Sequence, residues 1–90
     1  MGDRQLQREV LNLLAEQAQS VRLRVGSASP EDRAAMAHGL KGAARGVGAF
    51  VLADCADALE REPEIEQHRT RLEQAADAFL AFLSGLEQEP

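Results

Sequence analysis

A histidine accompanied by two basic residues is the feature of this 90-residue sequence that could do chemistry. Lys41 and Arg45 follow His38 at offsets of three and seven, so in a helix the three side chains lie on one side. Imidazole titrates close to neutral pH, so its unprotonated, nucleophilic form is well populated there. Nearby cations would stabilise an anion, and a phosphoryl group in particular. The pattern therefore indicates acceptance of a phosphoryl group on His38.

The segment that carries His38 contains more glycine than helix stability favours. Gly39, Gly42 and Gly46 flank the histidine on the predicted outer face, where a solvated helix would carry Glu, Lys or Gln. Each glycine inside a helix costs about 1 kcal/mol relative to alanine, so three would cost roughly 2–3 kcal/mol of a marginal stability. A bare surface lets the backbone of another macromolecule approach the imidazole, and Gly42, one turn from His38, is the main candidate for providing this clearance.

Four helical segments with short connections are predicted to position these residues. They run from Asp3 to near Gly26, from Ser29-Pro30 to a break at Gly48-Ala49, from about Phe50 to Arg61, and from Glu62-Pro63 almost to the C-terminus. Serine suits an N-cap, proline the first helical turn, and glycine the left-handed conformation that often ends a helix. We therefore predict an all-α fold, an antiparallel up-down-up-down four-helix bundle that forms a single domain over residues 1–90.

Apolar residues at helical spacing define the predicted core. In the first helix they are Leu6, Val10, Leu13, Leu14, Val21 and Val25, and in the last helix Ile65, Leu72, Ala75, Ala76, Phe79, Phe82, Leu83 and Leu86. We also expect Phe50 in the core, Cys55 as a small, buried or half-buried hydrophobic residue, and His68 without a functional role. The segment from Glu87 to Pro90 is expected to fray.

Composition argues against several classes of function. Ten Lys and Arg residues against fifteen Asp and Glu give a net charge of −5, which disfavours nucleic acid or an anionic membrane as the main partner. With one cysteine and two histidines the chain lacks the ligands of a zinc site, so no metal and no cofactor are expected. No apolar run is long enough for a membrane span or a signal peptide, and a single cysteine does not indicate an oxidising compartment, so we expect a cytoplasmic protein. We also expect the chain to be a monomer.

The segment around His38 resembles the histidine-containing phosphotransfer (HPt) domains of bacterial two-component phosphorelays. The resemblance rests on His38, Leu40, Lys41, Gly42, Gly48, Ala49 and Phe50, and continues through Leu52-Ala53 and Leu59-Glu60. The rest of the chain agrees with the family in length and helical pattern. The resemblance implies that His38 accepts a phosphoryl group from the aspartate of one receiver domain and passes it to another. It also implies that the receiver domain supplies Mg²⁺.

The neighbours of His38 are candidates for supporting roles. Lys41, which is among the matching residues and lies three positions from His38, would stabilise the charge of the phosphoryl group as it moves. Gly42 would give the partner clearance, and Arg45 and Gly39, which are outside the matching set, are further candidates for binding the partner. Glu60, at the end of the matching segment, could reach the other imidazole nitrogen and fix its tautomer, as carboxylates often do beside histidine. The alternative for Lys41, Arg45 and Glu60 is that they are solvated surface side chains without a function.

These observations predict a phosphorelay intermediate whose partners are receiver domains of a hybrid histidine kinase or a response regulator. It would be a phosphocarrier and not an enzyme, because the sequence has neither a P-loop nor a kinase glycine loop with which to use ATP. One alternative is a non-phosphorylated helical adaptor that docks a partner through the glycine-rich face and keeps binding it without His38. Another is the phosphoaccepting module of a larger histidine kinase, although Met1 favours a standalone protein.

Overall fold

The computed structural model describes residues 3–87, and within that range it contains four α-helices and no strand. They are α1 (Asp3–Arg24), α2 (Pro30–Gly46), α3 (Phe50–Arg61) and α4 (Glu66–Glu87), with a short 3₁₀ turn, η1 (Val25–Ser27), after α1. The prediction of an all-helical fold is confirmed. Residues 88–90 of the segment expected to fray lie outside the described residues. None of the four helices is both long and apolar enough to cross a membrane.

Capping and turn residues set both ends of α2. The Ser29 side chain accepts a hydrogen bond from the backbone N–H of Asp32 at 3.1 Å, and Pro30 is the first helical residue. After the helix, Gly48 adopts a φ of +78°, a conformation that favours glycine, and the chain turns into α3. The sequence therefore locates both boundaries of α2 for a clear physical reason.

The connection between α3 and α4 is longer than the proline signal suggests. Helix α4 begins at Glu66 and not directly after Pro63, because the intervening backbone forms a turn in which the N–H of Ile65 donates to the carbonyl of Glu62 at 3.2 Å. Similarly, α1 gives way to η1 after Arg24, just before the predicted end of the first helix.

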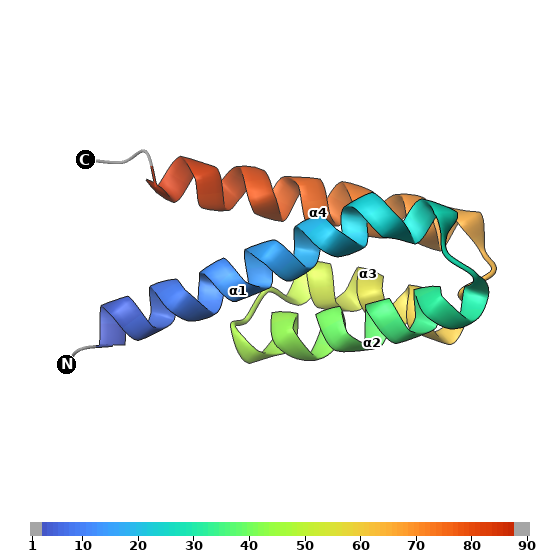
Figure 1. The fold of residues 1–90 in the computed structure, drawn as a ribbon, viewed down its shortest axis with the longest axis horizontal. Helices are drawn as coiled ribbons and strands as arrows, with labels where there is room; N and C mark the ends of the chain where they lie inside the picture. The colour runs from blue at the N-terminus through green and yellow to red at the C-terminus, as the bar shows by residue number, and fades with distance from the viewer. Residues whose placement is uncertain (1–2, 88–90) are drawn as a thin grey trace.

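The core lies between the four helices, each of which packs on its neighbours in the chain while α1 also packs on α4 (Figure 1). Its largest fully buried side chains are Val25, Leu40, Leu59 and Leu72. Leu14, Val21 and Leu52 are also buried in the core. Alanines fill the remaining core positions, namely Ala18, Ala37, Ala44, Ala53, Ala56 and Ala76. Alanine at these positions lets the helices pack closely, α2 and α3 above all.

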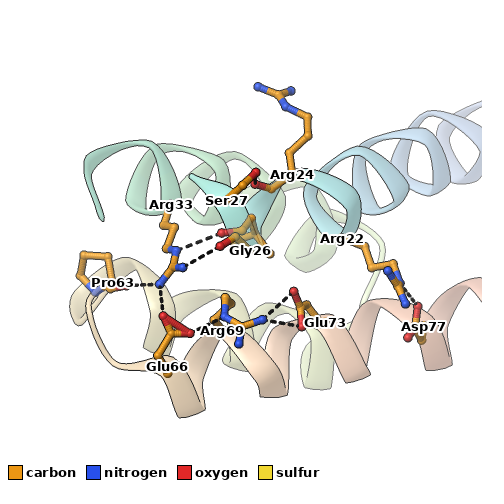
Figure 2. A network of polar contacts seen from close by, with 11 residues as sticks. Arg22, Arg24, Gly26, Ser27, Arg33, Pro63, Glu66, Arg69, Glu73 and Asp77 are labelled. Atoms are coloured by element: carbon orange, nitrogen blue, oxygen red, sulfur yellow. Dashed lines mark hydrogen bonds and ion pairs between the residues drawn. The ribbon is translucent and has the colours of Figure 1, made fainter. Parts of the chain in front are cut away.

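A buried arginine ties the ends of the helices together opposite the start of α1. The guanidinium of Arg33 donates hydrogen bonds to the carbonyls of Val25 (2.9 Å) and Gly26 (3.1 Å) in η1, and it contacts Glu66 of α4 at 3.1 Å (Figure 2). A further bond of 3.4 Å reaches the carbonyl of Pro63. The side chain is almost fully buried, so water cannot solvate its charge. The carbonyl and carboxylate acceptors provide the hydrogen bonds that water would otherwise make.

The predicted core is wrong at the end of the bundle where α1 begins and α4 ends. Both helices extend past α2 and α3 there (Figure 1). The residues that were predicted to lie in the core but are exposed at this end are Leu6, Val10, Leu13, Phe50, Phe82 and Leu86. With 22 residues each, α1 and α4 are longer than α2 and α3, so these side chains have no helix to cover them. Phe79, by contrast, is half-buried against the core, and Cys55 is half-buried.

Candidate functional site

His38 projects from the outer face of α2, and 71% of its side chain is exposed. The core face of the same helix is formed by Ala37, Leu40 and Ala44, which turns the histidine towards solvent and towards α3. Its Nδ1 atom lies 2.8 Å from Oε2 of Glu60, near the end of α3. The imidazole is therefore held by one contact while most of its surface stays open.

Lys41 lies between two carboxylates of α3. Its Nζ atom is 2.5 Å from Oε1 of Glu60 and 3.3 Å from Oδ1 of Asp57, and only 16% of its side chain is exposed. The hydrogen bond with Glu60 raises the pKa of Lys41, and the hydrogen bonds that Lys41 donates lower the pKa values of Glu60 and Asp57. Arg61 also contacts Asp57, at 2.9 Å. Lys41, Glu60 and Asp57 are consequently held in their charged forms near neutral pH.

Glu60 connects the two α2 residues that the sequence singles out. One carboxylate oxygen contacts the imidazole and the other contacts the ammonium group of Lys41. A carboxylate at Nδ1 requires a proton on that nitrogen, so the neutral ring must carry its lone pair on Nε2. The contact therefore leaves Nε2 as the nucleophilic atom of His38.

The glycines of α2 do not all face the same surroundings. No atom lies within 4 Å of the Cβ positions of Gly42 and Gly46, so both border open space. A Cβ on Gly39 would lie 3.1 Å from Nε2 of Gln17, which places Gly39 beside α1. Gly42 and Gly46 thus form the bare surface near His38, and Gly39 is the exception to the pattern predicted from the sequence.

The remaining predicted residues occupy the edges of the site. Arg45 is exposed on α2, and after Lys41 and Arg61 its charge makes a smaller contribution to the lowered pKa of Asp57. His68 lies on α4 with Nε2 at 3.2 Å from Glu62 and takes no part in the cluster around His38. Within residues 3–87, no three His, Cys, Asp or Glu side chains are grouped to hold a metal ion.

Asp57 is the residue of the site that the sequence analysis missed. It lies three positions before Glu60, so both carboxylates project from the same face of α3. His38 and Lys41 have the same spacing on α2, and the packing of α2 on α3 brings the two pairs together. This matched spacing of two basic and two acidic side chains is the sequence signal that could have identified Asp57.

No family model, curated protein or solved structure matches the chain, so the geometry of the site carries the functional argument.

Proposed function

We propose that this protein is a phosphorelay intermediate of the HPt type, which accepts a phosphoryl group on Nε2 of His38 and passes it to a second acceptor. The observation that supports the proposal best is an exposed imidazole whose Nδ1 is held by the carboxylate of Glu60 at 2.8 Å. The donor and the acceptor would be aspartates of receiver domains, as the resemblance to HPt domains implies.

The transfer needs little from the chain beyond orientation and charge. The lone pair of Nε2 forms the N–P bond while the P–O bond of the aspartyl phosphate breaks, and the aspartate leaves as a carboxylate. Nδ1 keeps its proton, so the ring becomes positively charged, and the carboxylate of Glu60 stabilises that charge. The reverse displacement by a second aspartate releases the phosphoryl group and restores the neutral ring.

Lys41 supplies positive charge near the nucleophile. Its two carboxylate contacts hold the ammonium group on the α3 side of His38, where it can stabilise phosphoryl oxygens in a loose transition state. The open surface at Gly42 and Gly46 gives a partner domain access to the imidazole. Arg45, exposed on the same helix, would contact that partner.

The proposal includes three further expectations from the sequence. The four helices form an antiparallel up-down-up-down bundle, which the packing of each helix on its neighbours supports. The chain works in the cytoplasm, together with the receiver domains that are expected to be its partners. It is a carrier without a nucleotide site, and Mg²⁺ would come from the receiver domain.

Transfer of radioactive phosphate tests the proposal. The purified chain is incubated with a panel of phosphorylated receiver domains from its own organism, and label on the chain is followed with time. The parent should become labelled through a bond that is labile in acid and stable in alkali, as a phosphoramidate is. His38→Gln should abolish labelling, and His68→Gln, which replaces the other histidine, should leave it unchanged.

Glu60→Gln separates the stabilisation of charge on the imidazole from the orientation of the ring. The amide can still contact the ring but cannot stabilise a positive charge on it, so labelling should persist at a lower rate. Equal labelling of the parent and His38→Gln would refute the assignment of the acceptor, and an alkali-labile bond would indicate a carboxylate instead.

The bare surface at Gly42 and Gly46 also suits an adaptor that is not phosphorylated. In that case no receiver would label the parent, and a partner would bind His38→Gln as tightly as the parent. Pull-down of the receiver panel with both proteins, run beside the labelling experiment, distinguishes the two functions.

A further inference from the structure

An apolar groove of about 550 Å³ opens at the end of the bundle where α1 begins and α4 ends. Phe50 and Val51 of α3 form one side, Phe82 and Leu86 of α4 form the other, and Leu11 of α1 contributes to the lining. Every residue that lines the groove is apolar or glycine. The groove exists because α1 and α4 extend past α2 and α3 there (Figure 1).

A second apolar surface lies on α1 at the same end. Leu6, Val10 and Leu13 follow one another at offsets of four and three, so they form a stripe along one face of the helix. All three are exposed, as are all the residues from 4 to 10. The open end therefore offers both a groove and a helical stripe of the kind that fills such grooves.

The exposed area at this end is large for a monomer. The seven large apolar side chains of the stripe and the groove rim have exposed fractions between 41% and 74%. At about 150–200 Å² for each large apolar residue, they expose roughly 700 Å², above the few hundred Å² of a typical surface patch. A stable interface of standard size buries about 800 Å² on each partner, so one such surface is close to what a dimer needs.

The charge distribution favours a second copy of the chain as the partner. The whole chain carries a net charge of −5, which repels an identical molecule. At the open end, however, residues 3–13 contain two acidic and two basic side chains, residues 47–53 and 78–86 contain none, and Glu87 at the end of α4 adds one acidic residue. Two copies can therefore approach through this end with less repulsion than the net charge of the whole chain would cause.

We propose that the open end is the interface of a symmetric homodimer. In each copy the stripe of Leu6, Val10 and Leu13 occupies the groove of the other copy, so that one patch serves as both surfaces of the interface. The proposal replaces the monomer expected from the sequence. It is independent of the function of His38, because Glu60, which holds that residue, is ten residues or about 15 Å along α3 from Phe50.

Sedimentation equilibrium over protein concentrations from about 1 µM to about 1 mM tests the dimer. The mass of the parent should rise towards twice the 9.8 kDa of one chain. Phe82→Glu on the groove and Leu6→Glu on the stripe should each weaken association at least about tenfold, because each would bury an unpaired charge. Leu23→Glu is the matched control, since Leu23 is an exposed leucine at the other end of α1 and should not affect association.

Circular dichroism and thermal melting at the lowest concentration show whether each variant folds, and all three positions are exposed, so their cores stay intact. A parent that remains monomeric throughout would overturn the proposal, as would a dimer that neither interface variant weakens. A monomer that co-sediments with phosphatidylcholine vesicles would identify lipid, and not a second copy, as the occupant of the groove.

Discussion

Substitution of Gly42 separates helix stability from access to His38. No atom lies within 4 Å of the Cβ position, so alanine there creates no clash and gains the difference in helix propensity, up to about 1 kcal/mol. For a domain of this size, 1 kcal/mol corresponds to a rise in melting temperature of about 4–8 °C. Gly42→Ala should therefore melt higher than the parent in a scan followed by circular dichroism.

Two other glycines calibrate this result. Gly39→Ala should gain less than Gly42→Ala, because its Cβ would lie 3.1 Å from Nε2 of Gln17 and that flexible side chain must move. Gly85→Ala is also unobstructed, but it lies in the last turn of α4, where helices fray, so its gain should be small. Gly85 belongs to a helix that contributes nothing to the site, and its variant should transfer phosphate as the parent does.

The functional half of the experiment uses Gly42→Gln. Glutamine is a good helix former and keeps the fold, but its side chain extends over the surface next to His38. We expect weaker receiver binding and slower transfer, measured by calorimetric titration and by labelling at saturating receiver. Gly42→Ala should show a milder loss despite its higher melting temperature. A folded Gly42→Gln protein with the affinity and rate of the parent would refute the idea that this glycine provides clearance.

Three further predictions concern stability. Arg33→Met should cost about 2–4 kcal/mol in thermal or urea unfolding, because it leaves one buried and one partly buried carbonyl group without their hydrogen bonds, whereas Arg24→Met, at an exposed position, should change little. Gly48→Ala should cost about 1–2 kcal/mol, because φ at this position is +78°. Lys41 lowers the pKa values of Glu60 and Asp57, so the stability from these contacts is present above the usual carboxyl range and is lost as pH falls through the lowered values. On acidification below about pH 4, the melting temperature of Lys41→Met should therefore fall by less than that of the parent.

Local signals made most of the fold predictable. Ser29 with Pro30 marks a helix start, and Gly48 adopts a backbone conformation that is unfavourable for other residues. Both signals depend only on residues that are close in the sequence. The bounds of α3, Phe50–Arg61, follow from the same kind of signal. The place of His38 opposite the core face of α2 was predictable too, because helical periodicity alone sets it.

Features that depend on the relative lengths of helices were not predictable in this way. Periodicity assigned Leu6 and Phe82 to the core, but whether a neighbour covers them depends on where α2 and α3 end. Phe50 lines the groove but stays 64% exposed, since it begins α3 at the open end. Likewise, the contacts of Lys41 with Asp57 and Glu60 require the register of α3 against α2, which no single-helix pattern contains.

The proposed function makes two opposing demands on His38, and that register meets both. An imidazole that is to react with another protein must be exposed, yet an exposed side chain has no packing to orient it. In this structure Glu60 holds the ring of His38 with one oxygen and the ammonium group of Lys41 with the other, so a single α3 residue orients both. Leu59, next to Glu60, is fully buried with Leu40 of α2 in the core. The buried side chains between α2 and α3 therefore fix the geometry of a surface site that they do not touch.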